Sequence, residues 1–204
     1  MKNKDEEEVW ANSPADDLII LDKLFLSKKL QYNCGPTGVY VPKPGWYITR
    51  PCVNFMGLGM GAKKVWLDLK TDHLPIGYFW CEWFNGSHYS VDWNPKTRTK
   101  LYTVKGTKDK DTLTKWNKWK KVSNKTIHWY PKRFDDILSN YDHINIEYIG
   151  NKIIEIHLRP NEDFEGKDIK EFIPVWEGQD ITPPKGYEYI ECPEHHGRIG
   201  AFVK

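Results

Sequence analysis

The sequence predicts an α+β protein in which one N-terminal helix precedes a series of short strands. Residues 13–31 place apolar side chains at helical spacing. From residue 39 onward, short apolar runs are separated by Pro and Gly, which is typical of strands. Aromatic residues make up 14% of the chain, enough to supply a buried core although 28% of the residues are charged.

The overall composition limits the size, the partners and the location of the protein. A length of 204 residues fits one domain or two tightly joined lobes. A formal net charge of +2 is too small to indicate a dedicated nucleic-acid or membrane-surface binder. Residues 1–12 are predicted to be a disordered charged tail, and their composition fits neither a signal peptide nor a transit sequence. Isolated cysteines and the lack of a membrane-length apolar stretch predict a cytoplasmic protein with reduced thiols.

The first predicted element is a helix from Ser13 to about Gln31. Ser13 supplies a capping oxygen, Pro14 suits the first turn, and the acids that follow favour the positive end of the helix dipole. The apolar side chains share one broad face, and Lys23 belongs to the basic residues of another face. Strand-like runs then follow at residues 39–41, 46–53 and 65–69.

A glycine-rich loop lies between the second and third of these runs. Gly57, Gly59 and Gly61 leave backbone N–H groups accessible, as phosphate binding requires. The loop does not fit the GxxxxGK[ST] pattern, and no helix follows directly as a dinucleotide fold would need. The pattern predicts the tip of a β-hairpin, which either folds over a triphosphate or is a flexible turn without a ligand.

The middle of the chain contains two strand-like runs and a basic stretch. Residues 78–83 and 88–93 are joined by Asn85-Gly86, which predicts a hairpin. Residues 105–133 are rich in Lys and Arg and include three tryptophans, so we expect a basic insertion with a short helix at about residues 112–121. Its surface either binds an acidic peptide tail or a nucleic-acid strand, or is a solvated insertion anchored by tryptophans in the core.

Acidic residues converge on a later hairpin, formed by residues 144–149 and 152–158. Glu147 lies on its first strand, and Glu155, His157 and Arg159 share one face because side chains alternate along a strand. Hard cations such as Mg²⁺ favour carboxylate oxygens, and Arg159 is suited to a phosphate or an acyl oxyanion. The alternative is a solvated polar face of an antiparallel sheet.

The C-terminal part is expected to be an acidic, loop-rich segment followed by two edge strands, residues 187–191 and 199–203. Cys192, His195 and His196 crowd one turn, but a zinc site there is a weak alternative because no second ligand cluster follows.

Four motifs along residues 16–163 together resemble the ATP-grasp superfamily. Asp22-Lys23 is similar to the family's Asp-Lys pair, and the strand before the glycine loop resembles the family's phosphate-binding strand, with Arg50 where lysine is usual. The segment before Ser90-Val91-Asp92 resembles the family's hinge, which holds adenine and ribose; the matching residues are Glu82, Trp83, Phe84 and His88. The later hairpin resembles the metal-binding end of the family's site, and the matching residues are Glu147, Glu155, His157 and Arg159. His157 replaces the expected Asn there, so either Asn161 substitutes as a ligand, or the metal preference shifts towards Mn²⁺, or turnover is impaired.

The resemblance implies two α+β lobes whose antiparallel sheets clasp ATP. The implied core is residues 13–163, with a flap lobe at about 36–77 and the basic insertion at 105–133, and residues 164–204 form an extension packed on it. It also implies ATP and Mg²⁺, with Mn²⁺ as an alternative. Lys23, Arg50 and the three loop glycines would contact phosphates. The metal ligands would be Glu147, Glu155, His157 and Asn161.

The implied activity is an ATP-dependent carboxylate–amine or carboxylate–thiol ligase that acts through an acyl phosphate. Lys23, Arg50 and Arg159 would be its catalytic residues, and the acceptor would be an amine, for which a peptide or a partner protein is a candidate. The resemblance is to a minimal form without the usual N-terminal domain, which leaves a homodimer as one way to complete the acceptor site. A noncatalytic nucleotide-binding module and an ATP-grasp kinase are the alternatives.

Overall fold

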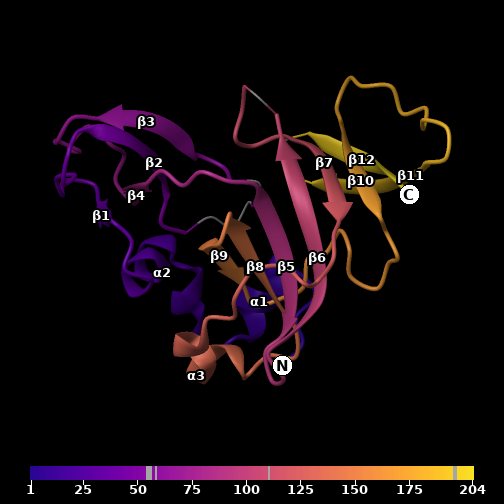
Figure 1. The fold of residues 1–204 in the computed structure, drawn as a ribbon, viewed down its shortest axis with the longest axis horizontal. Helices are drawn as coiled ribbons and strands as arrows, with labels where there is room; N and C mark the ends of the chain where they lie inside the picture. The colour runs from indigo at the N-terminus through magenta and orange to yellow at the C-terminus, as the bar shows by residue number, and fades with distance from the viewer. Residues whose placement is uncertain (54–56, 58, 110, 195–196) are drawn as a thin grey trace.

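The structure is a computed structural model that describes residues 1–53, 57, 59–109, 111–194 and 197–204. Two antiparallel sheets, one of four strands and one of eight, confirm the predicted α+β class (Figure 1). The short helices lie on the side of β8 and β9, and the C-terminal strands lie at the far end of the large sheet. Among the described residues, no helix is long and apolar enough to cross a membrane.

The helices are shorter and more numerous than the sequence predicts. The predicted helix at 13–31 is divided at Asp22, whose side chain accepts hydrogen bonds from the backbone N–H groups of Leu24 and Phe25 and so starts a new helix. In chain order the helical segments are α1 (Glu6–Asn12), the 3-10 helix η1 (Asp17–Leu21), α2 (Lys23–Lys29), the 3-10 helix η2 (Lys132–Phe134) and α3 (Asp135–Leu138).

Residues 1–12 are not a disordered tail, so that prediction is wrong. Asp5 caps α1 by accepting a hydrogen bond from the backbone N–H of Glu8. Val9 is completely buried in the main core. A helix this short depends on packing against the core, here through Val9, and the composition of residues 1–12 does not indicate this tertiary contact.

The small sheet has the strand order β1-β4-β2-β3. Its strands are β1 (Cys34–Pro36), β2 (Gly45–Pro51), β3 (Lys63–Leu67) and β4 (Tyr78–Glu82). The predicted hairpin around the glycine loop is confirmed, since β2 pairs with β3. Residues 39–41, predicted to be a strand, lie outside any strand, and β1 forms the edge instead.

The large sheet has the strand order β11-β12-β10-β7-β6-β5-β8-β9. Its strands are β5 (His88–Asn94), β6 (Thr99–Lys108), β7 (Trp116–Lys121), β8 (Ile144–Ile149), β9 (Lys152–His157), β10 (Glu171–Trp176), β11 (Glu188–Glu194) and β12 (Arg198–Val203). The β8–β9 hairpin confirms the prediction, and β11 is an edge strand as expected. The sequence analysis missed β10, and β12 is an interior strand, so residues 171–203 extend the sheet rather than packing on it.

Asn85-Gly86 does not join a hairpin. β4 belongs to the small sheet and β5 to the large one, so this short link is where the chain passes between the sheets. Gly86 has φ +137°, and a Cβ there would lie 2.9 Å from Gly150 Cα in the β8–β9 turn. The link therefore packs tightly against the hairpin that carries the acidic residues.

The basic stretch, residues 105–133, is not an insertion, and the prediction of a helix at 112–121 is wrong because β7 occupies most of that range. β6 and β7 lie in the middle of the large sheet. A β-bulge leaves Asn117 unpaired, so Trp116 and Trp119 share one face of a strand although they are three residues apart. Gly106 permits this packing, because a Cβ there would lie 2.5 Å from the Trp116 ring.

Candidate functional site

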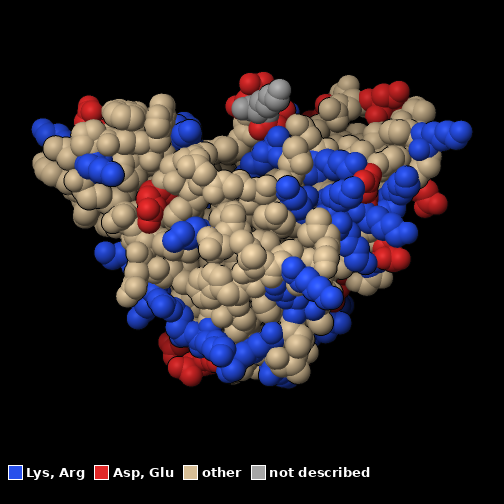
Figure 2. Space-filling model, in the orientation of Figure 1, with Lys and Arg blue, Asp and Glu red and all other residues tan. Residues whose placement is uncertain are grey.

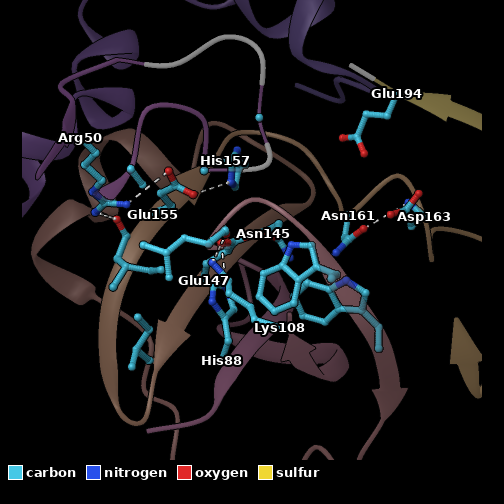
Figure 3. A pocket seen from close by; sticks show the side chains of 18 of the residues that line it. Arg50, His88, Lys108, Asn145, Glu147, Glu155, His157, Asn161, Asp163 and Glu194 are labelled. Carbon is cyan, nitrogen blue, oxygen red and sulfur yellow. Dashed lines mark hydrogen bonds and ion pairs between the residues drawn. The ribbon is translucent and has the colours of Figure 1, made fainter. Parts of the chain in front are cut away.

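A cavity of about 220 Å³ opens between the two sheets. Its lining includes Cys81 from the small sheet and Trp83 and Phe84 from the link. Figure 3 shows Arg50 of the small sheet together with Glu147 and Glu155 of the β8–β9 hairpin in this lining. Gly57 and Gly59 line the same cavity. Gly57, Gly59 and Gly61 all have positive φ values between 66° and 73°, which explains why glycine occupies these positions.

The predicted convergence of Glu147, Glu155 and His157 is confirmed. Glu147 and Glu155 are direct cross-strand partners on β8 and β9, and His157 follows two residues later on the same face. One ligand atom from each of the three residues lies within 4.8 Å of the others. Two carboxylates and an imidazole nitrogen at this spacing form a donor set for a divalent cation.

Two cations surround Glu155. Lys23 Nζ lies 3.0 Å and Arg50 Nη1 3.5 Å from Glu155 Oε1. A β-bulge leaves Ile154 unpaired, and its carbonyl oxygen accepts a hydrogen bond of 2.8 Å from Arg50 Nη2. Burial raises the pKa of Glu155, but the charges of Lys23 and Arg50 outweigh it and hold this pKa well below its ordinary value. Lys23 and Arg50, predicted to bind phosphates, therefore both lie at the acidic cluster, and Lys23 lines a smaller adjoining cavity.

Glu147 is paired with His88 across β8 and β5. His88 Nε2 lies 2.9 Å from Glu147 Oε2, and the imidazole ring packs edge-on against Trp116 at 4.6 Å between centroids. Burial raises the pKa of Glu147, but the His88 imidazole lowers it below its ordinary value. His88, predicted to contact adenine or ribose, thus borders the cavity while it supports a candidate metal ligand.

The link residues are divided between two environments. Trp83 and Phe84 line the cavity as predicted. Glu82, predicted to contact adenine or ribose, instead accepts a hydrogen bond of 3.0 Å from the backbone N–H of Asn33 and is not among the described residues that line the cavity.

Arg159 and His157 share a partner that sequence reasoning missed. Arg159 Nε donates a hydrogen bond of 2.8 Å to Glu6 Oε2, and His157 Nδ1 lies 3.7 Å from the same oxygen. Burial raises the pKa of Glu6, but His157 and Arg159 outweigh it and lower this pKa to about 2. The only local signal for the helix that carries Glu6 is the capping-box spacing of Asp5 and Glu8.

Asn161 does not join the candidate metal ligands. Its side-chain oxygen accepts a hydrogen bond of 3.1 Å from the backbone N–H of Asp163, and its Nδ2 donates one of 2.9 Å to Ser90 Oγ. Figure 3 shows Asn161 beside Asp163 and apart from Glu147, Glu155 and His157. Asn161 therefore organises the cavity wall in this structure.

Lys108 is a cavity residue that the sequence analysis did not single out. Its Nζ donates a hydrogen bond of 2.8 Å to the carbonyl oxygen of Leu113 and lies 4.5 Å from the centroid of the Trp116 ring. Burial lowers the pKa of Lys108, while the charges of Glu147 and Glu155 raise it by less. A partly buried cation beside the acidic cluster is suited to bind an anion in the cavity.

The outer face of β6 and β7 is basic, but the buried tryptophans do not belong to it. Lys105 and Lys120 are cross-strand partners, and Figure 2 shows Lys and Arg side chains gathered over this part of the sheet. Trp116 and Trp119 are buried and line the cavity. These two rings are therefore not available to stack on nucleic-acid bases beside the lysines.

The C-terminal strands close the far end of the cavity. Arg198 forms two hydrogen bonds with Asp163, of 2.8 and 2.9 Å, and an ion pair of 3.0 Å with Glu194. Burial raises the pKa of Glu194 to about 7, since Arg198 is shared with Asp163 and lowers it only in part. The zinc site considered at Cys192 involves His195 and His196, which lie outside the described residues.

The two facing sheets and the charged cavity between them define an α+β clasp. No protein-family profile matches the sequence, and no curated protein matches it. Among solved structures, N5-carboxyaminoimidazole synthetase from Staphylococcus aureus is similar with a TM-score of 0.55 at 10% identity, over 91% of this chain and 67% of that one. Biotin carboxylase from Campylobacter jejuni, in its β,γ-ATP complex, gives a TM-score of 0.55 at 12% identity, over 91% and 62%.

These similarities establish that the chain has the ATP-grasp fold, as the motifs predicted. The ATP-grasp ligase PsnB is also similar, with a TM-score of 0.44 at 12% identity over 76% of this chain. The chain spans 57% of the length of PsnB.

Proposed function

We propose that the protein is an ATP-dependent ligase that binds a metal–ATP complex between its two sheets and activates a carboxylate. The observation that carries this proposal is that ligand atoms of Glu147, Glu155 and His157 lie within 4.8 Å of one another. The cavity that they line is also lined by the cationic side chains Arg50 and Lys108. The fold supports it, because two proteins with this fold were solved with nucleotide: biotin carboxylase as a β,γ-ATP complex and N5-carboxyaminoimidazole synthetase as a complex with ADP.

The cavity provides separate surroundings for the base and the phosphates of ATP. Near the link, Ile48, Cys81, Phe84 and Ile154 form an apolar wall suited to adenine, and His88 lies beside it for the ribose. Arg50, Lys108 and the backbone of the loop glycines offer donors to the phosphates. Lys23 acts through Glu155, which it holds ionised.

The donor set fits a divalent cation. Glu155 directs Oε1 to Lys23 and Arg50, while its Oε2 lies 3.9 Å from His157 Nε2. Glu147, Glu155 and His157 would hold Mg²⁺ or Mn²⁺, which would neutralise phosphate charge during transfer.

In the proposed reaction, an oxygen of the substrate carboxylate attacks the γ-phosphorus of ATP, and the bond from that phosphorus to the β–γ bridging oxygen breaks. ADP leaves and an acyl phosphate remains. An amine then attacks the acyl carbon, loses a proton and expels inorganic phosphate. Arg50 and Lys108 position the transferred group, and Arg159 stabilises the acyl phosphate from the cavity edge.

The test is to trap the acyl phosphate. The protein is incubated with ATP, Mg²⁺ or Mn²⁺, a panel of carboxylates and hydroxylamine, and hydroxamate and ADP are measured together. A ligase yields both in equal amounts with inorganic phosphate. A stable phosphorylated product without hydroxamate would identify a kinase, and nucleotide binding without ADP formation across the panel would identify a noncatalytic module.

A further inference from the structure

Helix α1 brings Glu6 to His157, and both side chains line a small cavity together with Lys23 and Glu155. Two contacts outside Glu6 fix the helix. Val9 is completely buried in the main core, and the buried Asn3 donates a hydrogen bond of 3.2 Å from its Nδ2 to the carbonyl oxygen of Leu158. Leu158 directly follows His157, so the N-terminal segment is tied to the end of the strand that carries this candidate ligand.

The imidazole of His157 lies between two carboxylates. Its Nδ1 is 3.7 Å from Glu6 Oε2, and its Nε2 is 3.9 Å from Glu155 Oε2. Nδ1 is buried and has no hydrogen-bond partner among the described residues. A movement of about 1 Å would bring Nδ1 and the Glu6 carboxylate to hydrogen-bond distance.

A histidine that binds a metal usually donates its second ring N–H to a carboxylate or a carbonyl, which fixes the tautomer and the direction of the free lone pair. Glu6 stands on the Nδ1 side of His157, and the carboxylate of Glu155 stands on the Nε2 side. The three groups thus have the order of a carboxylate, a histidine and a metal site.

We propose that Glu6 is a positioning residue that accepts the Nδ1 proton of His157 and leaves Nε2 to bind the metal together with Glu147 and Glu155. This inference rests on the proposed metal–nucleotide site. Its consequence is a preference for Mn²⁺ over Mg²⁺, because an imidazole nitrogen suits Mn²⁺ better than the harder Mg²⁺.

A purely structural role would leave Glu6 as the partner of Arg159, with which it forms its shortest contact, of 2.8 Å. The two roles differ in their effect on the groups that bind the metal. A positioning residue changes the metal ligand set, whereas a partner of Arg159 changes stability without changing that set.

The experiment uses pulsed electron paramagnetic resonance of Mn²⁺ with a nonhydrolysable ATP analogue. Wild type should show coupling to a directly bound nitrogen, and Glu6→Gln should weaken Mn²⁺ affinity about 10- to 100-fold and reduce that coupling. Glu6→Asp, which keeps the charge, should recover part of the affinity, and Glu7→Gln, at an exposed neighbouring position, should match wild type.

His157→Asn provides the second comparison. It should abolish the nitrogen coupling, and Glu6→Gln should then have little effect on Mn²⁺ affinity in this background. Thermal unfolding checks that each variant folds, and if Glu6→Gln does not fold, Glu6→Asp and His157→Asn decide the question.

The failure of this inference is distinguishable from failure of the proposed function. If wild type binds Mn²⁺ and nucleotide but shows no nitrogen coupling, the role of Glu6 is overturned and the proposed ATP site still stands. The same holds if Glu6→Gln leaves the Mn²⁺ affinity unchanged. Absence of any metal–nucleotide binding to wild type would overturn both.

Discussion

The two ends of the cavity contain partly buried carboxylates in opposite electrostatic situations. At the hairpin end, Glu155 has both Lys23 and Arg50 as partners, and Glu147 has His88. At the C-terminal end, Glu194 shares one cation, Arg198, with Asp163. Two fixed cations therefore surround Glu155 at the hairpin end, whereas Glu194 at the C-terminal end shares its cation with another carboxylate.

The pKa values differ accordingly. The pKa values of Glu147 and Glu155 lie below the ordinary value, whereas that of Glu194 is raised to about 7. Burial acts in the same direction on all three, so the charged and hydrogen-bonding partners of each carboxylate decide the direction of its pKa shift. A metal site needs ionised carboxylates, and this favours the hairpin end for the proposed metal site.

The largest expected effect comes from removing a carboxylate of the hairpin end. Glu155→Gln replaces a charged oxygen ligand with a neutral amide, and turnover should fall on the order of 10²- to 10³-fold. ADP release measures this effect, and Glu191→Gln on the exposed side of β11 serves as the control. An unchanged rate in Glu155→Gln would contradict the assignment of metal to this end.

The cations of the hairpin end can be tested through stability. Lys23→Met removes the closer partner of Glu155 and leaves Arg50 at 3.5 Å. The free energy of unfolding should fall by about 2–3 kcal/mol, because the carboxylate loses part of its compensation. Lys28→Met, on the exposed side of the same helix, is the matched control in chemical denaturation. Equal stability of the two variants would show that Lys23 does not compensate Glu155.

Lys108 tests whether the cavity between the two ends binds phosphates. Lys108→Met keeps much of the side-chain length and removes the charge, so affinity for an ATP analogue should fall about tenfold, equivalent to about 1.4 kcal/mol. Titration calorimetry measures this change against Lys105→Met on the outer face of β6. Identical affinities in the two variants would place the phosphates away from Lys108.

The smallest effect is expected at the C-terminal end, as a pH dependence of stability. Because the folded protein holds the Glu194 proton more tightly than the unfolded chain, stability should fall as the pH rises from 4.5 to about 7. The side chain is 33% exposed, so solvent screening limits the loss to about 1 kcal/mol.

Glu194→Gln removes this titration while Arg198, Asp163, Glu162 and Arg159 remain around the site. Denaturation at pH 5 and pH 8 should therefore find a smaller difference in the variant than in wild type. The same difference in both proteins would mean that Glu194 titrates normally.

The elements that sequence reasoning predicted best are those that local patterns determine. The β8–β9 hairpin follows from alternation on both sides of Gly150-Asn151, and that alternation also placed Glu155 and His157 on one face. The ATP-grasp motifs then predicted the pairing of the sheets around a cavity. Trp83 and Phe84, predicted to bind ATP, line this cavity.

The errors arose where tertiary contacts decide between local alternatives. Asn85-Gly86 suits a hairpin turn as well as a link between sheets, and only the partners of β4 and β5 distinguish the two. The three-residue spacing of Trp116 and Trp119 suits a helix, but a β-bulge produces it here. Glu6 escaped notice because α1 depends on burial of Val9, which a charged N-terminal sequence does not indicate.

The measurement that tests the central claim most directly is calorimetric titration of wild type and Glu155→Gln with a nonhydrolysable ATP analogue, with and without Mg²⁺ or Mn²⁺. The cluster at the hairpin end predicts binding that strengthens with the metal in wild type and loses this dependence in Glu155→Gln. Binding that is equal with and without metal in wild type, or no binding under any condition, would contradict a metal–ATP site between the sheets.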